Sequence, residues 1–529
     1  MPSGRLTLRD SGLLALGAFL YTIACPPYDW SETAWVALTP FFLVLRQKKW
    51  QTGFWLGLLF AVLCCAGIGS WIYVAVTTYF SLPFPFDVLF TLLNYSIFAG
   101  LYVAIVTAFT CVLFRRSPGV LSVLGAPALW VAGEFVRSSW FAGISWELLG
   151  YTQYRSPLLI QIVDLTGVYG LSFLLALSGA VGAEVIVFLS SFTKLRTRNP
   201  PGERFPTLAV GTLTASVALV VVYGALRLQR YSSPAPANPP ALTVAVVHAN
   251  VASAQRWQRV HYASTLLTYL AITRHGIAET QPDLVIWPEF ALGFYLDREP
   301  LLRRQLNAFT QSTQTFLLVG APRMEEADTG IRSYNSAYLL SPEGHIVDVY
   351  DKIHLIPFAE YLPFSHTLLR PAHTEAPDDF TPGQRATIFS QPRYPWGVTI
   401  CYEITYPPMT RRLVLDGAQF LVNISNDTWG ASEGAAAQHF SMAVLRAVEN
   451  RRYLVRTATA GISGFVDPAG RPYILSASPE GVKVGTIFPR LELTVYARYG
   501  DWFAVLCSGV AVLTLLSGVS RSRGVGEKS

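Results

Sequence analysis

Three charged or reactive side chains in the second half of the chain lie immediately after strands or in a strand-end loop. Glu289 ends the run Leu-Val-Ile-Trp-Pro-Glu, Lys352 lies in Tyr-Asp-Lys-Ile-His-Leu, and Cys401 ends Gly-Val-Thr-Ile-Cys. Because α/β domains place active sites at strand ends, we expect these side chains to meet. A thiol attacks weakly until a neighbouring base or cation raises its thiolate fraction. Acyl transfer is therefore the candidate chemistry, with Cys401 as nucleophile, Glu289 as base and Lys352 as stabiliser of the oxyanion.

Each of these residues also has a plainer interpretation when it is taken alone. A strand cysteine usually packs in a core, a carboxylate after proline usually caps a helix, and a loop lysine usually adds surface charge. The occurrence of all three residues in comparable positions of one chain favours a catalytic role. The remaining cysteines lie in or beside long apolar runs, where cysteine is a small buried residue: Cys25, Cys64, Cys65, Cys111 and Cys507. Cys401 therefore has no partner for a disulfide within its own domain.

The composition indicates a membrane protein. Only 14% of the 529 residues are charged, and the mean hydropathy is +0.36. A bilayer core of about 30 Å requires roughly 20 apolar residues per helix. Eight apolar stretches are candidate spans: Ser11–Cys25, Ala34–Leu45, Gly53–Tyr79, Val88–Phe114, Gly119–Gly133, Gly167–Leu189, Thr207–Leu226 and Trp502–Val519.

The basic residues predict the orientation of these spans. They fall in short clusters beside apolar stretches, at Arg5/Arg9, Arg46/Lys48/Lys49, Arg115/Arg116, Lys194/Arg196/Arg198 and Arg521/Arg523. Because cytoplasmic loops carry the excess of Lys and Arg, both chain ends are predicted to be cytoplasmic. This divides the chain into a seven-helix membrane domain (1–228), an extracytoplasmic domain (229–500), and an eighth helix with a tail (501–529). A net charge of +6 distributed in this way does not indicate nucleic-acid binding.

From Leu242 onward the pattern changes to short β-rich runs separated by polar helical windows, as in layered α/β domains. The Pro-rich stretch 233–240 is the predicted linker. The predicted strands are Leu242–Val247, Leu284–Trp287, Phe316–Gly320, Ser336–Leu340, Gly397–Tyr402, Phe420–Ile424 and Tyr453–Ala458. The predicted helices are Arg256–Ile277, Pro300–Thr313 and Gly434–Asn450.

Three motifs carry a family resemblance. Trp287-Pro-Glu289, the stretch from Lys352 to Glu360-Tyr, and Cys401-Tyr-Glu403 resemble the Glu-Lys-Cys motifs of the nitrilase superfamily in order and separation. The external position of the domain, seven preceding spans and one following span are similar to the apolipoprotein N-acyltransferase family. Further stretches that agree with this family are Ser145–Gln153, Gly167–Ser172 and Ser425–Trp429.

The resemblance implies a nitrilase-like αββα sandwich inserted between the seventh and eighth membrane helices. It implies that Glu289, Lys352 and Cys401 form the catalytic triad, and that Cys401 takes a fatty acyl chain from a phospholipid as a thioester. The acceptor would be the α-amino group of a diacylglyceryl-cysteine at the N-terminus of an apolipoprotein. The membrane would be the bacterial inner membrane, with the catalytic domain on its periplasmic side.

The resemblance also assigns residues around the triad. Glu360, Glu403 and Tyr402 would support it, and Trp257, Asn426 and Trp429 would border the substrate. The arm Phe358–Leu369, which is apolar and carries few charges, is expected to dip into the membrane interface.

Two other classes of protein remain as alternatives. A membrane-tethered amidase would use the same triad with water as acceptor. A transporter with an accessory domain would need paired ionisable residues within its spans, for which Glu184 is the candidate. The eight histidines show no metal-ligand spacing, and no Gly-rich phosphate loop precedes a helix outside the membrane segments, so we expect neither a metal nor another cofactor.

Overall fold

The computed structural model divides the chain into two compact units. The first comprises Met1–Val76, Leu82–Arg230 and Tyr499–Ser529, and the second comprises Thr77–Ser81 and Tyr231–Arg498. The structure describes residues 6–79, 82–116, 120–139, 145–194, 205–232, 241–249, 251, 257–327, 330–357, 359–361, 379–430, 432–475 and 480–526. The arm Phe358–Leu369 therefore lies almost entirely outside the described residues, and its expected membrane contact stays a prediction.

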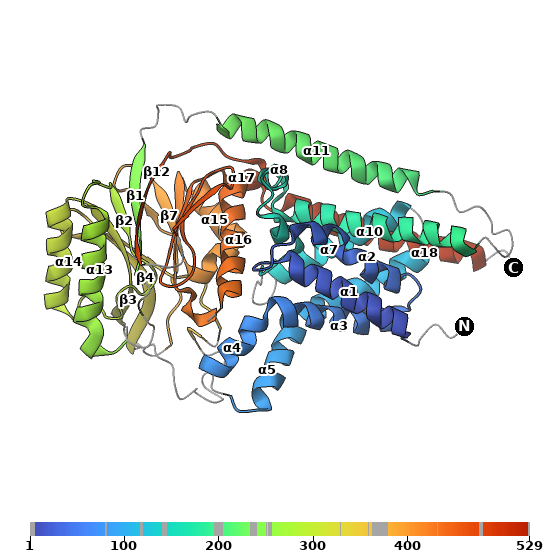
Figure 1. Cartoon of the computed structure of the whole chain (residues 1–529), viewed down its shortest axis with the longest axis horizontal. Coiled ribbons are helices and arrows are strands. Elements are labelled where there is room, and N and C mark those ends of the chain that lie inside the picture. The colour runs from blue at the N-terminus through green and yellow to red at the C-terminus, as the bar shows by residue number, and fades with distance from the viewer. Residues whose placement is uncertain are drawn as a thin grey trace. The chain divides into compact units, whose positions relative to one another are not determined.

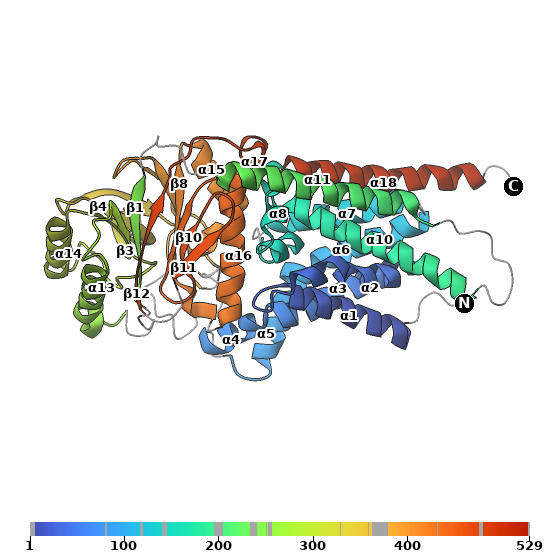
Figure 2. The ribbon, with the colours of Figure 1, turned by 45° about the horizontal axis from the view of Figure 1, so that its top comes forward.

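The first unit is a bundle of apolar helices (Figures 1 and 2). Its longer helices are α1 (Leu8–Ala24), α2 (Ala34–Leu45), α3 (Trp50–Ile68), α4 (Ser70–Tyr79), α5 (Phe86–Tyr95), α6 (Leu101–Arg116), α7 (Val120–Ser139), α10 (Val168–Lys194), α11 (Thr207–Ser232) and α18 (Trp502–Gly526). Short turns α8 (Pro157–Ile160) and α9 (Val163–Thr166) precede α10. A helix thus occupies each of the eight apolar stretches.

Four described helices are long and apolar enough to cross a membrane by length and composition. They are Trp50–Ile68, Phe86–Arg116, Val168–Ser190 and Thr207–Tyr231, whereas the other apolar helices are shorter or less apolar. The stretch 53–79, expected as one span, is divided because Gly69 caps α3 before α4 begins. Several apolar helices are therefore confirmed, while the count of eight spans stays a prediction.

Glu184, the acidic residue singled out in α10, has a partner. Its carboxylate lies 2.6 Å from the Arg46 guanidinium, and both side chains are mostly buried. Near the same pair, Lys48 lies 2.6 Å from Asp10. Because an ion pair removes the cost of an isolated charge in an apolar bundle, Glu184 is explained without a transport path.

The second unit is a sandwich of two six-stranded sheets, with α13 and α14 over one sheet and α15 and α16 over the other (Figures 1 and 2). The first sheet has the order β12-β1-β2-β3-β4-β5, and the second has the order β11-β10-β9-β8-β7-β6. The strands are β1 (Leu242–His248), β2 (Leu284–Ile286), β3 (Phe316–Ala327), β4 (Gly330–Leu340), β5 (Ile346–Asp351), β6 (Ile388–Phe389), β7 (Trp396–Ile400), β8 (Phe420–Ser425), β9 (Leu454–Ala458), β10 (Ser463–Val466), β11 (Pro472–Leu475) and β12 (Gly481–Ile487). The helices are α13 (Tyr262–Gly276), α14 (Pro300–Thr313), α15 (Pro407–Leu415), α16 (Glu433–Asn450) and α17 (Val495–Tyr499).

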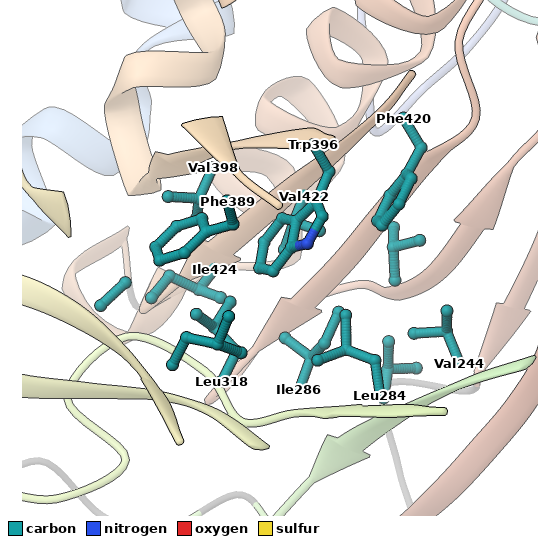
Figure 3. Close-up of a cluster of buried hydrophobic side chains, with 14 of the residues drawn as sticks. Val244, Leu284, Ile286, Leu318, Phe389, Trp396, Val398, Phe420, Val422 and Ile424 are labelled. Carbon is teal, nitrogen blue, oxygen red and sulfur yellow. The ribbon is translucent and has the colours of Figure 1, made fainter. Parts of the chain in front are cut away.

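Alternation along the strands builds this αββα arrangement. In β1, the side chains of Val244 and Val246 point to the other sheet, whereas Ala245 and Val247 pack under the helices. Both faces of the central strands are buried, which explains their nearly continuous apolar runs. Figure 3 shows the inter-sheet core, where Val244, Leu284, Ile286 and Leu318 face Phe389, Trp396, Val398, Phe420, Val422 and Ile424.

The expected α/β sandwich is confirmed, but the sequence pattern missed five strands. β5, β6, β10, β11 and β12 lie toward the outside of the sheets. The patterns of β5 and β12 are poor in fully buried positions, so they lack the apolar run that marks a central strand. α15 was also missed, because it is only nine residues long and its first two residues are prolines.

The inter-sheet core gives a test of stability. Trp396 is fully buried, with its ring stacked between Phe389 at 4.6 Å and Phe420 at 5.6 Å. We expect Trp396→Ala to lower the free energy of unfolding of the second unit by about 3–5 kcal/mol, because it leaves a cavity between the sheets. Val347→Ala, at a side chain that is 45% exposed, should change it by less than about 0.5 kcal/mol. Denaturant unfolding in detergent, followed by circular dichroism, measures both; equal effects would contradict the assignment of this core.

Candidate active site

The three predicted reactive residues lie just beyond strands that run in the same direction. Glu289 follows β2, Lys352 follows β5 directly, and Cys401 follows β7 directly. β1, β2 and β3 are parallel, as are β7, β8 and β9, and β5 is antiparallel to β4, which is itself antiparallel to β3. The Thr459 hydroxyl, just past β9, donates to the Glu289 carbonyl at 3.2 Å and ties the ends of the two sheets together.

Four polar side chains meet in a buried cluster. The ammonium of Lys352 lies 3.3 Å from Glu289 Oε1 and 2.9 Å from Glu360 Oε1. Asn335, in β4, donates its amide to the same two oxygens at 2.7 and 2.8 Å. The second oxygen of Glu360 accepts from the Ile356 N–H at 2.8 Å. One cation and one amide thus hold two carboxylates together away from water.

Cys401 lies beside this cluster in a strained conformation. Its backbone φ is +53°, a region that side-chain-bearing residues avoid, and its buried thiol lies within the electrostatic influence of both Glu289 and Lys352. Glu289, Lys352 and Cys401 are each no more than 2% exposed. The structure therefore brings together the carboxylate, the ammonium and the thiol that the sequence motifs singled out.

Burial and neighbouring charges set the protonation of these groups. Burial raises the pKa of Cys401, and Glu289 raises it further while Lys352 opposes the rise. Burial also raises the pKa of Glu289, against the opposing effects of Lys352 and Asn335. Burial alone would lower the pKa of Lys352, but Glu289 and Glu360 outweigh it and raise the pKa well above its usual value. The thiol is therefore neutral at rest beside a carboxylate that is placed to take its proton.

Glu403 connects the loop after β5 to the turn after β7. One carboxylate oxygen accepts from the N–H groups of Ile353 and His354 and from the Tyr350 hydroxyl, at 2.7, 3.0 and 2.8 Å. The other oxygen accepts from the Ile400 N–H at 2.7 Å. Burial raises the pKa of Glu403 to about 7, although these hydrogen bonds oppose the rise. Glu403 thus holds the two residues that follow Lys352 at a fixed distance from Ile400, the residue before Cys401.

The other residues expected at the site lie in different surroundings. Tyr402 is half-buried and packs edge-on against Tyr406 at 5.2 Å. Trp257 packs against Phe290, the residue after Glu289, at 5.0 Å. Asn426 accepts from the hydroxyl of Thr428 at 2.8 Å and so braces its own turn. The side chain of Trp429 lies outside the described residues, and its expected contact with substrate stays a prediction.

Sequence reasoning missed Asn335, which holds Glu289 and Glu360 together. A signal was present, because asparagine is depleted from strands and yet Asn335 immediately precedes the predicted strand Ser336–Leu340. It also missed Asp427, His439 and Arg456, which form a fully buried polar group close to Cys401. An arginine inside Leu-Val-Arg-Thr-Ala of β9 was the corresponding signal.

The comparisons with known proteins agree with this fold. Residues 243–494 match the carbon-nitrogen hydrolase domain, which defines the second unit as a member of the nitrilase superfamily. Residues 17–181 match the apolipoprotein N-acyltransferase N-terminal domain. The chain belongs to the apolipoprotein N-acyltransferase family and is an acyltransferase.

Relatives extend over nearly the whole chain. The apolipoprotein N-acyltransferase of Geobacter metallireducens is 34% identical over 96% of this chain and 95% of its own length. That of Azotobacter vinelandii is 31% identical over 95% and 94%. Among solved structures, an amidase from Nesterenkonia sp. is similar at 20% identity over 47% of this chain and 90% of its own, with a TM-score of 0.34. Nit3 from Saccharomyces cerevisiae, of the nitrilase superfamily, has 19% identity over 49% and 93%, with a TM-score of 0.37.

Asn335 gives a test of the electrostatics. Its hydrogen bond lowers the pKa of Glu289, so Asn335→Leu should raise that pKa further. The base is active as the carboxylate, which exists above its pKa, so reactivity is lost as pH falls through it. We expect the acid limb of the rate of Cys401 alkylation to move upward by about one to two pH units, because a hydrogen bond to a charged group contributes about 1.5–3 kcal/mol.

Peptide mass spectrometry of iodoacetamide-treated protein measures the rate of Cys401 alkylation across pH. Asn307→Ala, on α14, removes an amide away from the cluster and should leave the profile in place. An unmoved acid limb in Asn335→Leu, with the protein still folded, would show that Asn335 does not act on Glu289.

Proposed function

We propose that this chain moves a fatty acyl chain from a phospholipid, through a thioester on Cys401, to the α-amino group of the diacylglyceryl-cysteine of apolipoproteins. The observation that carries the proposal is the burial of the Cys401 thiol beside the ion pair of Glu289 and Lys352, in a chain of the apolipoprotein N-acyltransferase family. The relatives' names supply the lipoprotein substrate, and the apolar helices support a membrane-anchored donor.

In the first half-reaction, the Cys401 sulfur attacks the ester carbonyl of the phospholipid while Glu289 takes the thiol proton. A neutral resting thiol next to an ionised base fits this order of events, because the proton leaves as the carbon–sulfur bond forms. Lys352, held between Glu289 and Glu360, is placed to stabilise the negative oxygen of the tetrahedral intermediate. When the ester bond breaks, Glu289 returns the proton to the leaving alkoxide, which departs as a lysophospholipid alcohol.

In the second half-reaction, the α-amine of the lipoprotein attacks the thioester carbon. The attacking amine must be neutral, and Glu289 takes the proton that its nitrogen loses on forming the amide. The carbon–sulfur bond breaks, and Glu289 gives the proton to the sulfur to restore the thiol. Two anchored lipids thereby use one site in turn, because the covalent thioester stores the acyl chain between them.

The location of the enzyme follows from the same proposal. Residues 1–228 and 501–529 would form the membrane part, with eight spans in the bacterial inner membrane, and residues 229–500 would face the periplasm. The basic clusters beside alternate apolar stretches support this orientation. Trp257, which packs edge-on against Phe290 beside the base, would border the acyl chain.

Covalent capture tests the thioester. We expect the detergent-purified wild type, after exposure to phosphatidylethanolamine, to gain one fatty-acyl mass that hydroxylamine removes, because hydroxylamine cleaves thioesters. Cys401→Ala should gain none, and Cys507→Ala, which lacks a thiol of the first unit, should gain it as the wild type does. Glu289→Gln should slow the gain by about 10²–10⁴-fold, the usual contribution of a positioned base.

Intact mass spectrometry follows the adduct over time. A diacylglyceryl-cysteine peptide with a free amine should then discharge it, whereas the N-acetylated peptide should not. Discharge by buffer alone at the same rate would identify a hydrolase instead, and an adduct that persists in Cys401→Ala would contradict the nucleophile.

A further inference from the structure

A row of polar side chains crosses the outer face of the second sheet, beneath α16. Thr399, Asn423 and Arg456 are register partners on the adjacent strands β7, β8 and β9. Their strand neighbours Val398, Val422 and Val455 point the other way, into the inter-sheet core. All three polar side chains are at most 1% exposed. Buried polar groups are costly unless they are satisfied, so this row calls for a physical explanation.

The row ends on the backbone of Cys401. Asn423 donates its amide to the Cys401 carbonyl at 3.3 Å, and the ring of His439, from α16, lies with Nε2 3.1 Å from the same oxygen. A carbonyl oxygen only accepts, so Nε2 carries a proton in this contact. Two donors from different elements, β8 and α16, therefore converge on the carbonyl of the nucleophile.

Arg456 braces both donors from behind. One of its terminal nitrogens donates to the side-chain oxygen of Asn423. The other lies 2.7 Å from Asp427 Oδ2 and 3.1 Å from His439 Nδ1, and Asp427 Oδ1 also lies 3.0 Å from that ring nitrogen. A guanidinium presents several donors in a rigid plane, which a lysine does not. The planar guanidinium of Arg456 therefore contacts three side chains, those of Asn423, Asp427 and His439.

Asn423, His439 and Arg456 together form a clamp on the Cys401 carbonyl. The conformation of Cys401 explains why such a clamp is needed. A φ of +53° costs an L-residue free energy and persists only when surrounding contacts hold it. Because the peptide unit is planar and trans, fixing the Cys401 carbonyl also fixes the Tyr402 N–H on the opposite side. Asn423 and His439 thus determine the orientation of the peptide unit that follows the nucleophile.

We infer that His439, whose Nδ1 accepts from the Arg456 guanidinium, is a positioning residue whose Nε2–H holds the Cys401 carbonyl and so keeps the thiol aligned with Glu289. Asp427 acts on the ring only through Arg456, which it holds in place. This inference rests on the proposed function only for the identity of the acyl donor. Burial, reinforced by Arg456, lowers the pKa of His439, in agreement with a neutral ring that donates through Nε2. The carboxylate of Asp427 stays ionised, because Arg456 outweighs burial and lowers its pKa.

A pair of amide substitutions tests the clamp. The side-chain amide of His439→Gln reaches the place of Nε2 and keeps a donor there, whereas that of His439→Asn reaches only the place of Nδ1. We expect His439→Asn to slow alkylation of Cys401 by iodoacetamide about 10-fold to 100-fold, the scale of a misplaced reacting group, and His439→Gln to remain close to wild type. The limiting rate of acylation by phosphatidylethanolamine should fall in the same way, with an unchanged half-saturating concentration.

Leu445→Ala, at a fully buried position on the same helix, controls for loosened packing of α16. It should lower the melting temperature without changing the alkylation rate. Equal rates in His439→Asn and His439→Gln would overturn the inference, as would a slow Leu445→Ala. The wild type could take no acyl group from the phospholipid while Cys401 is still alkylated more slowly in His439→Asn than in His439→Gln. In that case the positioning role of His439 stands and the proposed acyl donor is wrong.

Discussion

The site depends on one interaction, the burial of Lys352 between Glu289 and Glu360. Three charges out of water are costly, and their mutual attraction compensates only where the geometry is good and the remaining lone pairs are hydrogen-bonded. Asn335 and the Ile356 N–H supply those bonds. Loss of one partner would leave an uncompensated charge in the interior, so the cluster holds the ends of β2 and β5 and the middle of β4 in a single arrangement.

The same charges decide how Cys401 is used. A thiolate cannot be stored beside two buried carboxylates, and the single ammonium is already shared between them. In the proposed mechanism, the thiol therefore keeps its proton until a substrate carbonyl arrives, and ionisation accompanies bond formation. This arrangement differs from cysteine enzymes in which a cation holds a preformed thiolate. A buried neutral thiol also reacts slowly with oxidants, since the thiolate is the reactive form.

Sequence reasoning found the parts of this site that motifs mark and missed the parts that tertiary structure creates. Glu289 and Cys401 follow apolar runs, so their position beyond strands was readable, whereas Lys352 was found through its motif because β5 lacks such a run. The αββα sandwich followed from the family resemblance. Asn335 lies within a strand and joins the site only because β4 lies beside β5. The outer strands β5 and β12 alternate weakly, because one of their faces is not fully buried. The break at Gly69 has no strong signal in an apolar run, since glycine is common in membrane helices.

Two networks on opposite faces of the second sheet meet at Cys401. On one side, the charged cluster acts on the sulfur; on the other side, Asn423 and His439 act on the carbonyl of the same residue. Glu403 ties the flanking amide of Ile400 to the loop that carries Lys352. A residue with positive φ has few contacts of its own to resist rotation, so restraints on its carbonyl and on the preceding amide determine where its side chain points. Because the sulfur must meet both a proton acceptor and a substrate carbon, a small rotation of this turn would separate it from one of them. The polar row beneath α16 is thus as much a part of the active-site geometry as the charges that touch the sulfur.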